Sequence, residues 1–419
     1  MSPHRAMAIW AGVLAGFAAT ASAQTNAPTM RLISVTNSAP LLGWLPPTNS
    51  IVQVEARPDL GTSVWARVAN ASLALTSAAG ESRATDLRAL PGTQYYRLRS
   101  SGSGRFGAFA SLGNRPDMPG YLTELGASWT RLNYPLDGSP LTNALPFLEA
   151  GFNLVLTFNW REAGGVLTTY GTPGEWPNAG FPFLNRATYQ QRVRDALTPL
   201  LPYLVLGHQV WVQCENEIGD ASLAADGRYW RGTTADYLSQ LGAFAEAARG
   251  LSTNFVIVLT SFASENLDTV LAPADPKYAF QTNRMITLLA QGDYDAADVH
   301  FYGGTVDIPA KAAWVTARLP AGRRWCSTEN GGPDPRYSGT PVSWTNNLAL
   351  FEQVQSQQVA ARLDAVSTNG AAVALWFSLF DLQGESDAFN HLGLLEGSVS
   401  PPRKRAAFGA FQSYASTNR

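Results

Sequence analysis

Two glutamates stand at the ends of otherwise apolar stretches of the chain. Glu217 closes the stretch that begins at Trp211, and Glu329 closes the stretch that begins at Trp325. Burying a carboxyl group at such a position costs free energy unless the group is paired with another side chain or is solvated at the opening of a functional site. One such glutamate is usually a cap or an ion-pair partner, but two of them predict a catalytic carboxyl pair. Glu215 is expected to face the same way as Glu217 but deeper, as a buried network member or, less readily, as the acid itself.

Other polar residues close further apolar runs. Asp298, His300 and Tyr302 alternate along one run and therefore share a face. For His300 alone, a satisfied core histidine is the alternative. Arg131 ends another run, where its positive charge would keep a neighbouring carboxylate ionised. The chain's histidines lack metal-ligand spacing and no strained Gly-x-Ser-x-Gly elbow is present, so neither a metal, a cofactor nor a serine hydrolase is expected.

The pattern of apolar and amphipathic stretches after residue 104 predicts the strands and helices that position these residues. Eight apolar runs alternate with amphipathic stretches: Phe106–Leu112, Trp129–Asn133, Asn153–Phe158, Val210–Cys214, Asn254–Thr260, Ala297–Phe301, Arg324–Thr328 and Ala371–Phe377. The intervening helices are expected at Tyr189–Leu197, Thr234–Arg249, Arg284–Leu289 and Trp344–Ser367. This alternation predicts a (β/α)₈ TIM barrel over 104–419, whose active site would lie at the carboxyl ends of its strands. A doubly wound sheet is the second choice, because no glycine-rich phosphate loop follows the first strand.

With Glu217 on the fourth strand and Glu329 on the seventh, the chain resembles the clan A retaining glycoside hydrolases, such as families 5 and 39. The resemblance implies that Glu217 is the general acid/base and Glu329 the nucleophile. It further implies that Asn216 binds the neighbouring sugar hydroxyl, and that Arg131 and the His300-x-Tyr302 pair orient the nucleophile. The usual Asn-Glu-Pro of family 5 is Asn-Glu-Ile here, which bears on the family more than on the clan.

Aromatic side chains at two other strand ends are candidate sugar platforms, because flat apolar rings suit the C–H faces of sugars. Trp376 resembles the clan's aromatic floor beneath the sugar being cleaved. Trp160, after the third strand, is expected either to stack on a neighbouring sugar or to pack in the core. The expected partner is thus a β-linked glycan that is cleaved by double displacement. We expect it to bind in an open cleft and to be cleaved by endo action. An inactive carbohydrate-binding barrel and a transglycosylase are the alternatives.

The segment 24–103 has a different pattern, with short alternating stretches between prolines and glycines. It predicts a small β-sandwich, resembling a fibronectin type III module, and the 101–104 stretch Ser-Gly-Ser-Gly marks the boundary. Trp44 or Trp65 could bind glycan there, but a packing spacer is the first choice.

The first 23 residues predict a secretory signal, with His4 and Arg5 before a short apolar stretch and Ala21-Ser22-Ala23 before the cleavage point. The mature chain is therefore expected to be secreted or periplasmic, without a membrane span, and monomeric. Its two cysteines, Cys214 and Cys326, lie on strands across the predicted barrel and are expected to be buried free thiols. A net charge of -2 and the lack of long basic runs argue against nucleic acid as a partner.

Overall fold

The computed structural model describes residues 30–36, 39–45, 50–58, 65–78, 81–88, 94–102, 104–110, 115–138, 141, 143–160, 162–163, 166–167, 180–220, 230–334, 347–382, 391–397 and 399–418. The predicted signal segment lies outside these residues, and so do the glycine-containing segments 164–165 and 171–176. Contacts divide the chain into two units: one runs up to Gly102 and includes Pro202–His208, and the other comprises Ser103–Leu201 and Gln209–Arg419.

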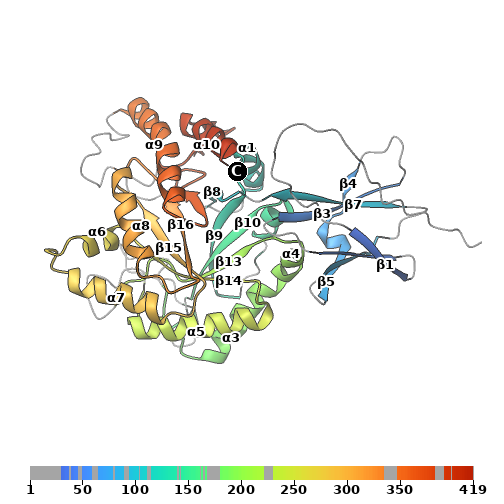
Figure 1. Ribbon diagram of the computed structural model, residues 1–419, viewed down its shortest axis with the longest axis horizontal. Coiled ribbons are helices and arrows are strands. Elements are labelled where there is room, and N and C mark those ends of the chain that lie inside the picture. Colours follow the sequence, from blue (N-terminus) through green and yellow to red (C-terminus); the bar gives the residue numbers. More distant parts are fainter. Residues whose placement is uncertain are drawn as a thin grey trace, which may run out of the picture. The chain divides into compact units, whose positions relative to one another are not determined.

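The larger unit is a closed barrel of eight parallel strands, in the order of the chain (Figure 1). The strands are β8 (Phe106–Phe109), β9 (Trp129–Pro135), β10 (Asn153–Asn159), β13 (Val210–Cys214), β14 (Val256–Phe262), β15 (Ala296–Phe301), β16 (Arg324–Asn330) and β17 (Ala374–Trp376). Every residue of β10, β13 and β15 is buried, as expected for parallel strands covered on both faces. The predicted (β/α)₈ barrel is confirmed.

The strand ends differ from the predicted runs by a few residues. β17 contains only the centre of the predicted Ala371–Phe377 run, and β14 begins two residues later than predicted. The reason for the later start is a turn, in which the Asn254 amide donates to Ser252 Oγ before the strand begins. Gly107 allows the close approach of β8 and β9, because a Cβ there would lie 1.9 Å from the Trp129 carbonyl oxygen.

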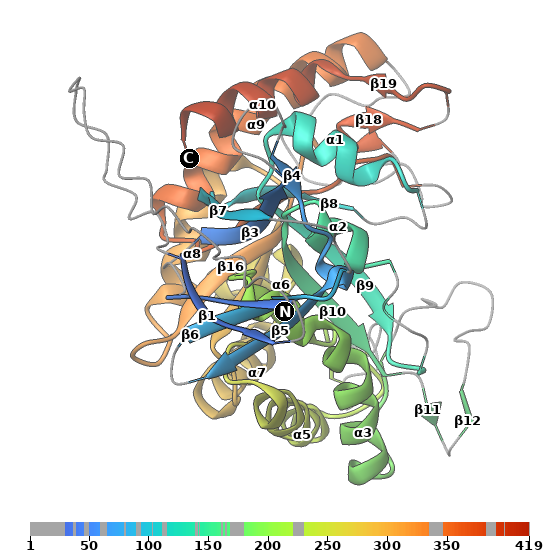
Figure 2. The same cartoon turned by 90° about the vertical axis from the view of Figure 1, so that its right-hand side faces the viewer.

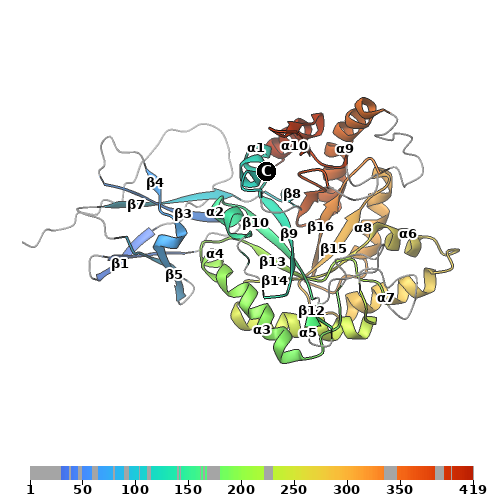
Figure 3. The ribbon, with the colours of Figure 1, turned by 180° about the vertical axis from the view of Figure 1, so that it is seen from behind.

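Helices flank the barrel strands. They are α1 (Met118–Leu125), α2 (Leu145–Glu149), α3 (Arg186–Leu197), α5 (Thr234–Leu251), α6 (Ser264–Leu271), α7 (Tyr278–Gln291), α8 (Ile308–Thr316), α9 (Leu348–Thr368) and α10 (Ala406–Thr417). α3 packs beside α5 (Figure 3), and α10 packs beside both α9 and α1 (Figure 2). Both α3 and α5 begin with a side-chain cap. The Asn185 side chain accepts a hydrogen bond from the Thr188 amide, and Thr233 forms a reciprocal capping box with Asp236. Among the described residues, no helix has the length and apolar character needed to cross a membrane.

Short pieces complete this unit. The pairs β11 (Glu162–Ala163) with β12 (Val166–Leu167) and β18 (Leu395–Glu396) with β19 (Arg403–Lys404) are antiparallel. Both cysteines are buried and free, as expected from their positions on β13 and β16.

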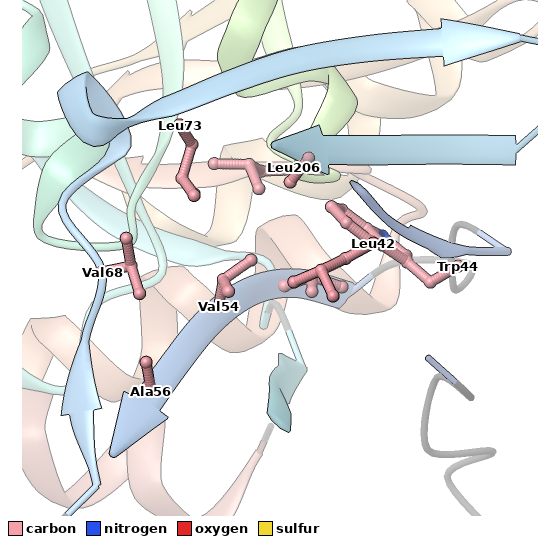
Figure 4. Close-up of a cluster of buried hydrophobic side chains, with 9 residues drawn as sticks. Leu42, Trp44, Val54, Ala56, Val68, Leu73 and Leu206 are labelled. Carbon is pink, nitrogen blue, oxygen red and sulfur yellow. The ribbon is translucent and has the colours of Figure 1, made fainter. Parts of the chain in front are cut away.

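The part of the smaller unit that precedes Gly102 contains two antiparallel sheets. One has the order β1 (Met30–Thr36), β2 (Ala39–Trp44), β6 (Glu81–Asp86), β5 (Leu73–Ala78); the other has the order β4 (Ala66–Arg67), β3 (Ser50–Arg57), β7 (Tyr95–Gly102). Its core contains Trp44, Val54 and Leu73, together with Leu206 from the segment that follows α4 (Leu201–Val205) (Figure 4). Trp44 is therefore a core residue, in agreement with a packing role.

Candidate active site

The barrel interior changes from apolar to polar along its strands. Trp129 and Trp211 meet edge to face, with ring centres 5.4 Å apart, within an apolar cluster that includes Val155. Two residues further along the same strands, the same faces carry Arg131, Gln213 and Thr157, because strand side chains repeat their direction every second residue. All three are fully buried, so their polar atoms need partners inside the protein.

These buried groups satisfy one another in a network that spans the barrel. Thr157 Oγ1 accepts a hydrogen bond from Arg131 Nε at 2.8 Å and donates one to Gln213 Oε1 at 2.6 Å. Gln213 Nε2 then donates to Asp298 Oδ2 at 2.8 Å. Thr157 and Gln213 were not singled out from the sequence; their signal was a polar residue in the middle of a run that was otherwise apolar.

Asp298 is the centre of this network. Its carboxylate accepts hydrogen bonds from Ser261 Oγ at 2.7 Å, from Thr328 Oγ1 at 2.5 Å and from the Thr328 amide at 2.9 Å. Burial by itself would raise its pKa, but the His300 charge and hydrogen bond, followed by Arg131, hold the pKa of Asp298 well below its usual range. Asp298 therefore remains an anion that ties β14, β15 and β16 together below the site.

Glu329 is held at the carboxyl end of β16 by two residues. Arg131 Nη1 donates to its Oε1 at 2.7 Å, and the Tyr302 hydroxyl donates to its Oε2 at 2.5 Å. Burial, and then the Glu329 charge, raise the pKa of Tyr302 well above its usual value, so the phenol remains a donor. The guanidinium also donates to Asn216 Oδ1 at 2.7 Å through Nη2, and so links the fourth strand end to the seventh.

Glu217 lies near Glu329 and contacts His300. His300 Nδ1 lies 2.5 Å from Glu217 Oε1, and one carboxylate oxygen of Glu217, one of Glu329 and the His300 nitrogen all lie within 4.8 Å of one another. Burial raises the pKa of Glu217, the positive charge of His300 opposes that rise, and the Glu329 charge adds to it. The two glutamates thus meet on either side of the charged His300 ring, whose Nδ1 lies 2.5 Å from Glu217 and 3.5 Å from Glu329, and only Glu329 also contacts the Arg131 guanidinium and the Tyr302 phenol.

The backbone that presents Glu217 is strained. Glu215 has φ 64° and Glu217 has φ 40°, both in the left-handed region that costs a non-glycine residue about 1–3 kcal/mol. The expectation that Glu215 faces the same way as Glu217 is wrong, because the strand ends at Cys214 and this left-handed turn ends the alternation. Glu215 instead accepts hydrogen bonds from Asn159 Nδ2, the Trp160 amide and Gln240 Nε2 at 2.8–3.0 Å. It is fully buried, as a network member.

The two candidate platforms are enclosed by protein. Trp160 is 2% exposed and meets Tyr189 edge to face at 5.2 Å, an arrangement that agrees with the core-packing alternative. Trp376 is fully buried and its indole N–H donates to the Leu392 carbonyl oxygen at 3.0 Å. Either ring could contact a sugar only after the groups that cover it had moved, so their predicted substrate roles remain predictions.

Phe109 and Phe377 form an aromatic pair beside Arg131 and Tyr302, the two partners of Glu329. Their rings are stacked with centres 5.1 Å apart, Phe377 meets Tyr302 edge to face at 5.8 Å, and the Arg131 guanidinium lies over Phe109 at 5.1 Å. Phe109 ends β8 and Phe377 directly follows β17, and this position at a strand end is the sequence signal that would have drawn attention to both rings.

A metal ion is the other occupant to test, because Glu217, His300 and Glu329 offer ligand atoms within 4.8 Å of one another. The donors fit poorly, since Arg131 places a positive charge 2.7 Å from Glu329 and Tyr302 already donates to its second oxygen. The arrangement is better suited to moving a proton between carboxyl groups than to holding a cation.

Comparison with known proteins gives the fold. No protein-family model matches the chain, and no curated protein does. Among solved structures, a glucosidase from Croceicoccus marinus matches with a TM-score of 0.50 and 13% identity, over 74% of this chain and 67% of that one. An exo-β-1,4-mannosidase from Opitutaceae bacterium strain TAV5 has a TM-score of 0.49 and 16% identity, over 75% of this chain and 59% of that one. A third neighbour, the GH53 catalytic domain of Ignisphaera aggregans, has a TM-score of 0.45, 15% identity, and coverage of 74% and 91%.

These structural neighbours are glycoside hydrolases built on a parallel eight-stranded barrel, and this chain spans about three fifths of the length of the mannosidase. At 13% identity the likeness to the glucosidase concerns the fold alone, and the chemistry of this chain has to be argued from the residues of the site.

Proposed function

We propose that this protein is an exported, retaining glycoside hydrolase that cleaves β-linked glycans, with Glu217 as acid/base and Glu329 as nucleophile. The observation that carries the proposal is the approach of the two carboxyl groups, since one oxygen of Glu217 lies within 4.8 Å of one oxygen of Glu329. Retaining enzymes place their carboxyl groups about 5–5.5 Å apart, whereas inverting enzymes leave about 6.5–9.5 Å for a water molecule. The short separation therefore favours direct attack by one glutamate on the sugar.

The surroundings of the two glutamates support this division of roles. An acid must hold its proton near neutral pH, and burial raises the pKa of Glu217 in that direction. A nucleophile must present its oxygen to the anomeric carbon in a fixed position, and the Arg131 guanidinium 2.7 Å from Glu329 Oε1 and the Tyr302 hydroxyl hold that carboxyl group in place.

The reaction follows in two displacements. A Glu329 oxygen attacks the anomeric carbon, the glycosidic C–O bond breaks, and the departing oxygen takes the Glu217 proton. Water then attacks the glycosyl ester, Glu217 removes a proton from that water, and the Glu329 carboxylate is released. Arg131 and Tyr302 accommodate the charge on Glu329 as it is lost in the first step and regained in the second.

The decisive experiment combines a panel of β-glycans with the Glu329→Ala variant. Reducing-end release identifies the polymer, and NMR of the first product gives its anomeric configuration, which should be β. Glu329→Ala should lose turnover and regain it with azide, yielding an α-glycosyl azide. Wild-type activity in this variant, or an α product from the wild-type enzyme, would remove the nucleophile assignment. Mass spectrometry of secreted protein beginning at Gln24 tests export.

Endo action in an open cleft and a monomeric state are part of the same proposal. The product-length distribution separates endo from exo attack, and light scattering reports the oligomeric state. A transglycosylase would use the same two glutamates but give acceptor-linked products. Analysis of products formed with an added acceptor sugar therefore distinguishes it from a hydrolase.

A further inference from the structure

A lysine is buried between two helices that flank the barrel. Lys311, on α8, is 1% exposed, and α8 packs beside α6 (Figure 1). A lysine is almost never buried to this extent unless its ammonium group has partners. Here the ammonium lies 2.6 Å from Asp268 Oδ1 and donates a hydrogen bond to Ser264 Oγ at 2.9 Å, both on α6. Asp268 matches the charge of Lys311, and Ser264 connects the ammonium to the site.

The Ser264 side chain binds both backbone polar groups of Tyr302. Its hydroxyl donates to the Tyr302 carbonyl oxygen at 2.9 Å, and the Tyr302 amide donates to the same Oγ at 3.3 Å. Ser264 follows β14 and Tyr302 follows β15, whose paired residues run as far as Phe262 and Val299. The serine side chain therefore joins the two strand ends beyond the last backbone pair.

Lys311 determines the direction in which this hydroxyl donates. A hydroxyl has one proton and two lone pairs, whereas an ammonium group can only donate. The Lys311 ammonium therefore occupies one lone pair of Ser264 Oγ, and the Tyr302 amide occupies the other. The single proton of Ser264 is then directed to the Tyr302 carbonyl oxygen. The buried cation thus fixes the hydrogen bonds that Ser264 makes to the backbone of Tyr302.

Tyr302 lies where the strand no longer holds the backbone. β15 ends at Phe301, and Gly303 follows with φ 94°, a conformation that glycine adopts without steric cost. The Arg362 guanidinium, from α9, donates to the carbonyl oxygens of Phe301 and Gly303 on either side of Tyr302. The backbone of Tyr302 itself is bound by Ser264. The position of this tyrosine therefore depends on side chains that come from the flanking helices.

We infer that Lys311 is a positioning residue, which acts through Ser264 on the backbone of Tyr302 and so places the phenol that holds Glu329. The Tyr302 hydroxyl donates to Glu329 Oε2 at 2.5 Å, so a displacement of the Tyr302 backbone changes this hydrogen bond directly. Misplacing a reacting group by about 1 Å can slow a reaction about 100-fold. The effect on catalysis rests on the proposed role of Glu329 as nucleophile, whereas the effect on Tyr302 does not.

The test uses Lys311→Met, Ser264→Ala and Tyr302→Phe in the full-length protein. Lys311→Met removes the ammonium group and keeps an unbranched side chain in its place. Ser264→Ala removes the connection to Tyr302 and leaves the ion pair between Lys311 and Asp268, so it decides the matter if Lys311→Met does not fold. The matched control is Asp268→Asn, which alters the ion pair from its other side and leaves the hydrogen bond from Lys311 to Ser264.

Turnover of aryl β-glycosides shows whether Lys311 acts through Tyr302. Lys311→Met and Ser264→Ala should each lower kcat about 5- to 30-fold with little change in KM, and Asp268→Asn should stay within about twofold of wild type. The double variant Lys311→Met/Tyr302→Phe should be at most about twofold slower than Tyr302→Phe, because two residues that act through one contact are not additive. Losses that multiply in the double variant, or a wild-type kcat in folded Lys311→Met, would overturn the inference.

A measurement that does not require turnover separates this inference from the catalytic proposal. In protein labelled with ¹³C at the tyrosine Cζ atoms, the NMR signal of Tyr302 is the one that Tyr302→Phe lacks. This signal should shift in Lys311→Met and in Ser264→Ala, because the hydrogen bond to Glu329 changes, and should keep its position in Asp268→Asn. An unchanged Tyr302 signal in the first two variants would refute the role of Lys311. A wild-type protein that cleaves no glycoside would instead remove the catalytic proposal, and the signal would still decide whether Lys311 positions Tyr302.

Discussion

His300 Nδ1 lies 2.5 Å from Glu217 Oε1, so the proposed acid and an imidazole share one short hydrogen bond. The other ring nitrogen, Nε2, lies 3.2 Å from Asp298 Oδ2. Burial alone would lower the pKa of His300, but the charges of Glu329, Asp298 and Glu217 together raise it to about 10. The resulting imidazolium opposes the rise that burial imposes on the pKa of Glu217.

Replacing His300 should therefore shift the pH profile of the enzyme. In His300→Phe the opposing charge is lost, and the pKa of Glu217 rises further. A general acid works while it is protonated, so the basic limb of the kcat/KM profile should move to higher pH, with kcat reduced about 10- to 100-fold. The profile is measured on a substrate with a poor leaving group. His391→Gln is the control, and a basic limb that stays in place or moves downward would contradict the assignment.

Tyr302→Phe removes one hydrogen bond to the proposed nucleophile and nothing else from its carboxylate. A hydrogen bond to a charged group contributes about 1.5–3 kcal/mol, so kcat should fall roughly 10- to 100-fold while KM changes little. Tyr294→Phe is the matched control, because that buried hydroxyl donates to the Leu289 carbonyl oxygen, away from the glutamates. Similar losses in both variants would indicate a general packing defect.

The sequence predicted the parts of this molecule that periodicity and strand ends encode. Each buried parallel strand reads as a continuous apolar run, so the barrel and the convergence of Glu217, Glu329, Arg131 and His300 could be foreseen. The direction of Glu215 could not, because it depends on a left-handed turn at a non-glycine residue, which local preference opposes. The burial of Trp376 could not be foreseen either, because it depends on tertiary packing against the segment around Leu392, which follows the last barrel strand.

Glu215 and Glu217 can be told apart by substituting each with glutamine. Glu215 accepts hydrogen bonds from Asn159, Trp160 and Gln240, and Gly180 leaves room for its carboxylate, since a Cβ at position 180 would lie 2.0 Å from Glu215 Oε2. In Glu215→Gln the new side-chain NH₂ group would face the donors that Glu215 accepts from, so we expect a loss of about 1–3 kcal/mol in the free energy of unfolding. Activity should fall by the same factor for all leaving groups.

Glu217→Gln should instead depend on the leaving group. Activated aryl glycosides need little protonation, so their cleavage should be spared in the first step, while substrates with poor leaving groups slow by 100-fold or more. Denaturant unfolding and a series of aryl glycosides measure both quantities. A leaving-group dependence that appears in Glu215→Gln and not in Glu217→Gln would transfer the acid role to Glu215.

Chelation tests the metal alternative for Glu217, His300 and Glu329. Double displacement by two carboxyl groups needs no cation, so dialysis against EDTA should leave kcat within twofold and the thermal midpoint unchanged. Loss of activity that Zn²⁺ or Mn²⁺ restores would contradict the proposed chemistry.

Asp298 should matter for stability in a pH-dependent manner. Despite its burial, the pKa of Asp298 is lowered by His300 and Arg131, so its stabilising effect is present above the unfolded value of about 3.9 and is lost as the pH falls below it. Asp298→Asn leaves a buried cation without its partner and should cost about 3–5 kcal/mol at pH 7. The difference from wild type should shrink at pH 3. The control is Asp195→Asn, on the exposed side of α3, whose free energy of unfolding should not approach that of the wild type at low pH. If Asp298→Asn lowers the free energy of unfolding equally at pH 7 and pH 3, the charge of the carboxylate is not what holds the strands together.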